Sequence, residues 1–146
     1  MRRVATLSAR DQRLVRAARE VRRHAHAPYS GFKVGAAVRG RDGRVFAGCN
    51  VENASLGAGI CAERSAVVQA VAAGLRPGDL EAVAVYAQSS SPTPPCGMCL
   101  QVLVEFGRDL DVFLAGGSGM QRTRLAALYP EPFTDLPTPS RRRAKG

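Results

Sequence analysis

The chain has 146 residues, of which 45% are hydrophobic and 23% are charged, and its formal net charge at pH 7 is +9. This length suits a single domain with a core of its own. No run of about 18 or more apolar residues occurs, so we expect no membrane-spanning helix, and no apolar secretory signal follows the basic first residues.

The positive charge lies mainly at the two ends of the chain. Residues 1–23 contain eight arginines and two acidic residues, and residues 141–146 contain four basic residues. Residues 24–140 contain nine basic and ten acidic residues, and the few aromatic residues are not interleaved with the arginines. Basic ends can bind polyanions without specificity, but this distribution predicts no specific nucleic-acid partner.

A helix is predicted over about residues 8–25. Ser8 followed by Asp11 resembles a capping box at its start, and apolar residues from Leu14 to Ala25 recur on one face. Two short apolar runs follow, over residues 34–38 and 44–49. The Asp-Gly pair between these runs indicates a β-hairpin.

Helical and strand-like segments alternate over the second half of the chain. We expect, in order, a polar loop over 50–59, a helix over 62–73, a strand over 82–87, a helix over 97–106, a strand over 111–115 and a short helix over 123–128. This order predicts an α/β fold, a three-layer α/β/α sandwich with a mixed sheet of about five strands. Residues 1–135 would form the single domain, and residues 136–146 a disordered basic tail.

Two short motifs carry the chemistry. Cys61-Ala62-Glu63-Arg64 opens one predicted helix, and Pro95-Cys96-Gly97-Met98-Cys99 opens the next. Three thiols suit zinc, and a catalytic zinc site has three protein ligands with one position left for water. Glu63 would then be the acid and base beside that position. Because Cys49 is a fourth thiol, a closed four-cysteine site in a non-catalytic zinc module is an alternative. These spacings favour metal over disulfides and a reducing, cytoplasmic location.

The chain resembles the small, zinc-dependent cytidine deaminases over about residues 24–133. The resemblance rests on residues 27–37, on Gly48-Cys49-Asn50-Val51-Glu52-Asn53-Ala54-Ser55, and on the two cysteine motifs. It implies hydrolysis of cytidine and 2′-deoxycytidine to uridine and 2′-deoxyuridine in pyrimidine salvage. It also implies one Zn²⁺ per chain and a homotetramer with shared active sites.

The resemblance also implies individual roles. Cys61, Cys96 and Cys99 match the zinc ligands, and Glu63 matches the proton carrier. Arg64 is placed to hydrogen-bond the cysteine sulfurs and to offset their negative charge. For the substrate, the implied contacts are Asn50 and Glu52 on the ribose 3′-hydroxyl, Phe32 beside the base, the Ala62 backbone N–H on the base, and Phe133 reaching a neighbouring subunit's site.

Two residues depart from the family's pattern. Leu100 stands where an arginine is usual, and Leu56 stands where a tyrosine near the 5′ end of the sugar is usual. These departures leave open a deaminase for a modified cytosine nucleoside, such as an antibiotic of the blasticidin type.

Overall fold

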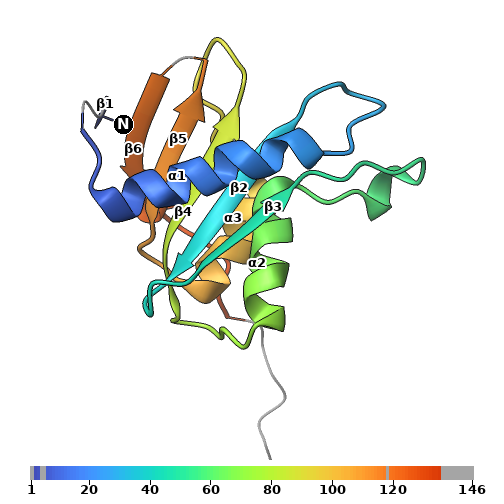
Figure 1. Cartoon of the computed structure of the whole chain (residues 1–146). Helices are drawn as coiled ribbons and strands as arrows, with labels where there is room; N and C mark the ends of the chain where they lie inside the picture. Colours follow the sequence, from blue (N-terminus) through green and yellow to red (C-terminus); the bar gives the residue numbers. More distant parts are fainter. Residues whose placement is uncertain (1, 4–5, 118, 136–146) are drawn as a thin grey trace, which may run out of the picture.

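A computed structural model describes residues 2–3, 6–117 and 119–135 of the chain (Figure 1). The predicted basic tail, residues 136–146, lies outside the described residues. None of the described helices is both long enough and apolar enough to cross a membrane.

The elements follow the predicted alternation of helices and strands. In chain order they are β1 (Arg2–Arg3), α1 (Ala9–Val21), β2 (Val34–Gly40), β3 (Val45–Cys49), α2 (Ala62–Ala72), β4 (Leu80–Ala87), α3 (Gly97–Phe106), β5 (Asp111–Gly116), β6 (Gly119–Arg124) and α4 (Leu125–Leu128). The predicted cap is present at the start of α1, because the Ser8 Oγ accepts from the Asp11 N–H and donates to the Asp11 carboxylate.

All six strands form one sheet in the order β1-β6-β5-β4-β2-β3. β4 and β5 are parallel, and every other neighbouring pair is antiparallel. The mixed sheet is therefore confirmed, and its six strands are the four predicted segments together with β6 and the two-residue β1. The β2–β3 hairpin turns at Gly43, whose φ of +88° lies in the left-handed region that glycine tolerates.

Helices cover both faces of the sheet (Figure 1). On one face, Leu14 and Ala18 of α1 pack with the buried residues Ala37, Ala84 and Phe113 of the sheet. On the other face, α2 and α3 pack on the neighbouring positions of the same strands, through residues that include Val67, Leu103, Val83, Val85 and Leu114. The alternation of side chains along each strand thus supplies both cores, and the three-layer α/β/α sandwich is confirmed.

The predicted helix over 123–128 begins too early. Thr123 and Arg124 belong to β6, which pairs along its whole length with β5, and α4 starts at Leu125. β6 was not predicted because its sequence, Gly-Met-Gln-Arg-Thr-Arg, lacks the apolar alternation of a typical strand. The backbone hydrogen bonds to β5 decide its conformation.

Gly48 lets α2 approach β3 closely. A β-carbon at this position would lie 2.4 Å from the Ala66 backbone nitrogen of α2. This close packing fixes the helix whose first residues carry the cysteine and glutamate of the first motif.

Candidate zinc-dependent active site

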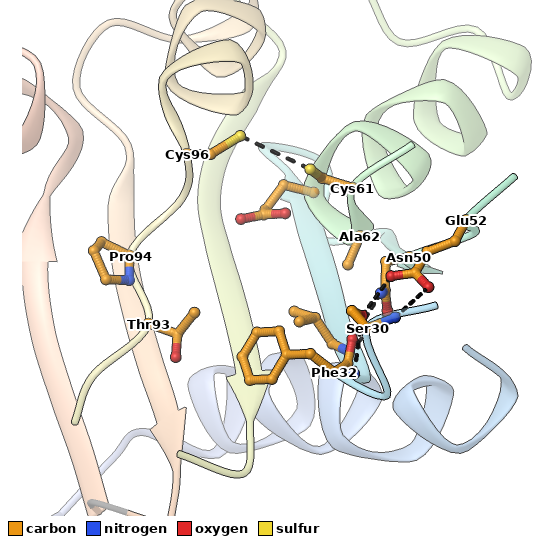
Figure 2. A pocket seen from close by; sticks show the side chains of 11 residues that line it. Ser30, Phe32, Asn50, Glu52, Cys61, Ala62, Thr93, Pro94 and Cys96 are labelled. Atoms are coloured by element: carbon orange, nitrogen blue, oxygen red, sulfur yellow. Dashed lines mark hydrogen bonds between the residues drawn. The ribbon is translucent and has the colours of Figure 1, made fainter. Parts of the chain in front are cut away.

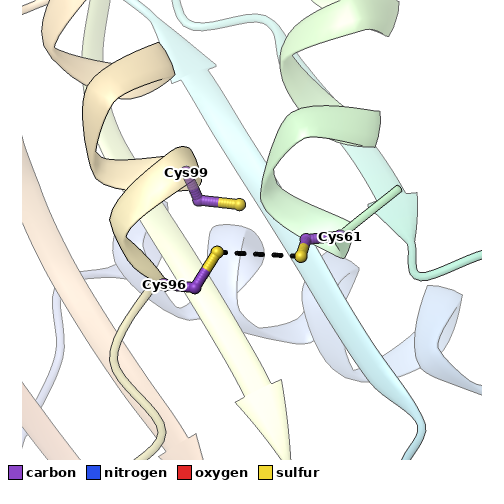
Figure 3. Close-up of side chains that lie close together, drawn as sticks. All are labelled: Cys61, Cys96 and Cys99. Atoms are coloured by element: carbon purple, nitrogen blue, oxygen red, sulfur yellow. Dashed lines mark hydrogen bonds between the residues drawn. The ribbon is translucent and has the colours of Figure 1, made fainter. Parts of the chain in front are cut away.

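The two cysteine motifs meet at the N-terminal ends of α2 and α3. Cys61 is the N-cap residue of α2, Cys96 is the N-cap residue of α3, and Cys99 lies in the first turn of α3. The Sγ atoms of all three lie within 4.8 Å of one another, and those of Cys61 and Cys96 are 3.8 Å apart. Figure 3 shows the three sulfurs converging from the two helices.

The geometry of this cluster fits zinc. Two sulfurs that each bind a tetrahedral zinc at about 2.3 Å lie about 3.8 Å apart, the separation found between Cys61 and Cys96. In the described part of the chain, Cys49 does not belong to the cluster. Three thiols with no fourth cysteine leave one coordination position for water, which favours a catalytic over a closed structural site.

Burial changes the expected electrostatics of the thiols. Burial raises the pKa of Cys61 and Cys99, and the carboxylate of Glu63 raises that of Cys99 further. Burial also acts against ionisation of Cys96, but hydrogen bonds from Cys99 outweigh it and leave the Cys96 pKa lowered. The helix ends therefore do not suffice to ionise all three thiols. A bound cation would supply the remaining stabilisation.

Glu63 is buried beside the sulfurs. Only 5% of its surface is exposed, and its Oε2 lies 3.6 Å from the Cys99 Sγ. Burial raises the pKa of this carboxyl above its usual value. A carboxyl group that holds its proton more readily than an exposed glutamic acid is suited to acid and base work at the cluster.

Arg64 contacts the cluster from the next position of α2. Its Nη2 lies 3.8 Å from the Cys61 Sγ, as predicted for a residue that hydrogen-bonds the sulfurs. Its buried Nε has no hydrogen-bond partner within the described part of the chain. The guanidinium thus places a positive charge beside thiolates that would carry a net negative charge with zinc.

A cavity of about 240 Å³ opens in front of the cluster (Figure 2). Its lining includes most of the predicted substrate contacts together with residues that were not singled out; the full set is Ser30, Phe32, Val34, Asn50, Glu52, Cys61, Ala62, Glu63, Thr93, Pro94 and Cys96. None of these is lysine, arginine or histidine. Phe32 is 42% exposed, so its ring is available to a ligand and is not a core residue.

Asn50 holds the backbone on both sides of Lys33. Its Nδ2 donates to the Phe32 carbonyl at 2.9 Å, and its Oδ1 accepts from the Val34 N–H at 2.8 Å. The amide therefore has a structural role in addition to its place in the cavity lining.

Glu52 binds the turn before Phe32. Its Oε1 accepts from the backbone N–H groups of Tyr29 and Ser30 at 2.9 and 3.1 Å, and its Oε2 accepts from the Ser30 hydroxyl. The hydrogen bonds from Ser30 hold the pKa of the Glu52 carboxyl below its usual value. Glu52 thus faces the cavity as a carboxylate with fixed orientation.

The other predicted residues fall in different surroundings. Ala62 is buried in the cavity lining, whereas Phe133 is 58% exposed and does not line it. Leu56 is 81% exposed on the loop before Cys61, and Leu100 packs against the core beneath α3.

Ser30, Thr93 and Pro94 line the cavity but were not predicted. Ser30 lies in the Pro-Tyr-Ser-Gly turn, and the other two lie in the proline-rich loop before Cys96. Their closeness in sequence to the motif residues is the feature that could have identified them as part of the cavity lining.

Comparisons with known proteins show the family to which the chain is related. The sequence model of a family described as the cytidine and deoxycytidylate deaminase zinc-binding region matches residues 8–115. The chain is 43% identical to a cytidine deaminase from Halalkalibacterium halodurans over 125 residues, which cover 84% of this chain and 93% of that protein.

Solved structures of cytidine deaminases are also similar to this chain. The crystal structure of cytidine deaminase from Burkholderia pseudomallei is 46% identical with a TM-score of 0.81, and the match covers 87% of this chain and all of that one. The enzyme from Mycobacterium tuberculosis is 37% identical with a TM-score of 0.72, over 87% of this chain and 99% of that one.

Proposed function

The chain belongs to the zinc-dependent cytidine and deoxycytidylate deaminase family, and from this premise we propose that it hydrolyses cytidine and 2′-deoxycytidine. The reaction consumes water and gives uridine or 2′-deoxyuridine and ammonia. The observation that carries the proposal is the buried Glu63 carboxyl beside three converging sulfurs at the inner end of an open cavity.

Cys61, Cys96 and Cys99 would hold the zinc ion. When bound there, zinc would supply acidification of a water molecule, so that a nucleophile would be available near neutral pH. Glu63 takes a proton from the attacking water and delivers it to the ring nitrogen next to the carbon that bears the amino group. The second proton of the same water then passes through Glu63 to the amino nitrogen, and the bond between this nitrogen and the ring carbon breaks as ammonia leaves. One carboxyl can carry both protons if it lies within reach of both nitrogen atoms.

Arg64 acts on the cluster and not on the substrate in this proposal. The negative charge of three thiolates would exceed the positive charge of a zinc ion. This excess of negative charge would oppose acidification of a water molecule at the metal. The Arg64 contact with the Cys61 sulfur offsets part of that charge.

The cavity lining favours a nucleoside over a nucleotide. Among the described residues, no cationic side chain lines the cavity, whereas the Glu52 carboxylate does, so a 5′-phosphate would find no cationic partner there and would add negative charge beside a carboxylate. Asn50 and Glu52 would bind the ribose 3′-hydroxyl, Phe32 would lie beside the base, and the Ala62 N–H would contact it.

Phe133 is proposed to act in a neighbouring subunit. Its ring is largely exposed and lies outside the cavity of its own chain, which suits a role in a homotetramer with shared sites. A cytoplasmic location and a place in pyrimidine salvage complete the proposal.

The decisive experiment incubates purified protein with cytidine and follows ultraviolet absorbance and released ammonia. Glu63→Gln should keep one zinc per chain and lower kcat by at least about 10³-fold, since two proton transfers lose their carrier. Glu105→Gln, which changes an exposed glutamate of α3, is the control and should leave kcat unchanged. Turnover by Glu63→Gln at the wild-type rate would refute the assigned role.

A substrate panel tests the finer claims. Cytidine and 2′-deoxycytidine should be turned over, and cytidine 5′-monophosphate should not. Blasticidin S belongs in the panel because the exposed Leu56 leaves the proposed 5′ side without a tyrosine hydroxyl. Turnover of blasticidin S without turnover of cytidine would favour the modified-nucleoside alternative.

A further inference from the structure

We propose that Ser30 is a positioning residue that couples the sugar-binding and base-binding sides of the cavity through its hydroxyl group. This inference rests on the proposed function, because it takes Glu52 as a sugar contact and Phe32 as a base contact. It adds a residue to which neither the motifs nor the comparisons assign a role.

The Ser30 hydroxyl joins two elements of the cavity lining. Its Oγ donates to the Glu52 Oε2 and accepts from the Phe32 N–H at 3.0 Å. Its single proton is therefore committed to the carboxylate, and its acceptor capacity serves the backbone of the aromatic residue. One side chain thus fixes both the direction of the Glu52 carboxylate and the start of the segment that carries Phe32.

Asn50 completes the connection from the opposite side. While Ser30 binds the Phe32 N–H, Asn50 binds the Phe32 carbonyl at 2.9 Å and the Val34 N–H at 2.8 Å. Both polar backbone groups of Phe32 are thereby held by side chains that line the cavity. Figure 2 shows Ser30, Asn50 and Glu52 grouped on one side of the cavity next to Phe32.

The hydrogen-bond inventory of Glu52 explains why the Ser30 hydroxyl matters. An ionised carboxylate can accept about four hydrogen bonds, and three are used by the Tyr29 N–H, the Ser30 N–H and the Ser30 hydroxyl. The remaining acceptor site is the one that a sugar hydroxyl can occupy. Without the Ser30 hydroxyl, the Oε2 atom can turn toward water, and the direction of that free site is no longer defined.

The zinc chemistry does not depend on this network. Ser30 makes its side-chain hydrogen bonds to Glu52 and Phe32, and none of them reaches the cysteine cluster or Glu63. Loss of the hydroxyl should therefore weaken substrate binding and leave the proton transfers intact.

The test compares Ser30→Ala with the wild-type protein on cytidine and on 3′-deoxycytidine. A hydrogen bond to a charged group predicts that KM for cytidine rises about tenfold in Ser30→Ala, with kcat within about twofold of wild type. The preference for cytidine over 3′-deoxycytidine in kcat/KM should fall by a similar factor, because a Glu52 carboxylate without a fixed orientation no longer forms a strong hydrogen bond with the 3′-hydroxyl. Ser30→Thr keeps a hydroxyl and should restore most of that preference.

Ser55→Ala is the matched control. Ser55 lies in the neighbouring loop, and its hydrogen bond to Asn53 uses its backbone N–H, so the variant should behave as wild type. An unchanged preference for the 3′-hydroxyl in Ser30→Ala, or a loss of zinc or of kcat in that variant, would overturn the inference. Wild-type protein that fails to deaminate cytidine would instead refute the proposed function.

Discussion

The close contact between β3 and α2 predicts that Gly48→Ala disturbs the active site without touching it. The new β-carbon would lie 2.4 Å from the Ala66 backbone nitrogen and 2.6 Å from the Ser65 carbonyl carbon. Ordinary contact begins at 3.4 Å, so α2 must move outward by about 1 Å. Both nearest atoms belong to the backbone, and a rotamer change therefore cannot relieve the overlap.

The magnitude follows from this displacement. Overpacking of this kind costs about 3 kcal/mol, which for a chain of this size lowers the melting temperature by about 10 °C. Because α2 begins with Cys61 and carries Glu63, the same shift misplaces a zinc ligand and the proton carrier. A 1 Å misplacement in an active site costs about 10²-fold in kcat/KM.

The assay combines thermal unfolding, zinc content and cytidine turnover. Gly57→Ala is the control, since a β-carbon there meets no atom within 4 Å and should change neither melting temperature nor turnover. If Gly48→Ala melts and turns over cytidine as the wild type does, then close packing of α2 on β3 does not position the site.

Three further changes test the metal site and the core. Cys49→Ser should leave zinc near one per chain by elemental analysis, because Cys49 lies outside the sulfur cluster, and loss of zinc would favour a closed site. Arg39→Met should cost about 3 kcal/mol in urea unfolding, because Arg39 is 5% exposed and its guanidinium pairs with Asp11 at 2.9 Å and Glu81 at 2.6 Å. The half-exposed Arg44 is the control, and Arg44→Met should cost less than about 1 kcal/mol. Burial opposes ionisation of Asp11, but hydrogen bonds from Ser8 and Arg39 hold its pKa below the usual 3.8. The ionised carboxyl therefore stabilises the fold fully above pH 3.8. The difference in free energy of unfolding between the wild type and Asp11→Asn should shrink as the pH falls below that value. A difference that stays constant from pH 5 to pH 3 would contradict this.

Local sequence patterns were sufficient to predict those features whose conformation depends on a few adjacent residues. The Ser8 cap, the Asp-Gly hairpin and the starts of α2 and α3 were all predicted, because caps and turns depend on a few adjacent residues. β6 was not, because its pairing with β5 and not its own pattern makes it a strand.

The sequence by itself determined which chemical groups the site contains: three thiols that can hold a metal and one carboxyl that can move a proton, all at the starts of two helices. The tertiary structure brings these two helix starts together. The tertiary structure alone decided the environment of those groups. Packing of α2 on the sheet buries Glu63 and raises its pKa. Folding of the 27–33 segment onto residues 50–52 gives Ser30 its place between Glu52 and Phe32. Burial and hydrogen bonding between distant segments depend on how whole elements pack, and no local pattern of residues specifies that packing.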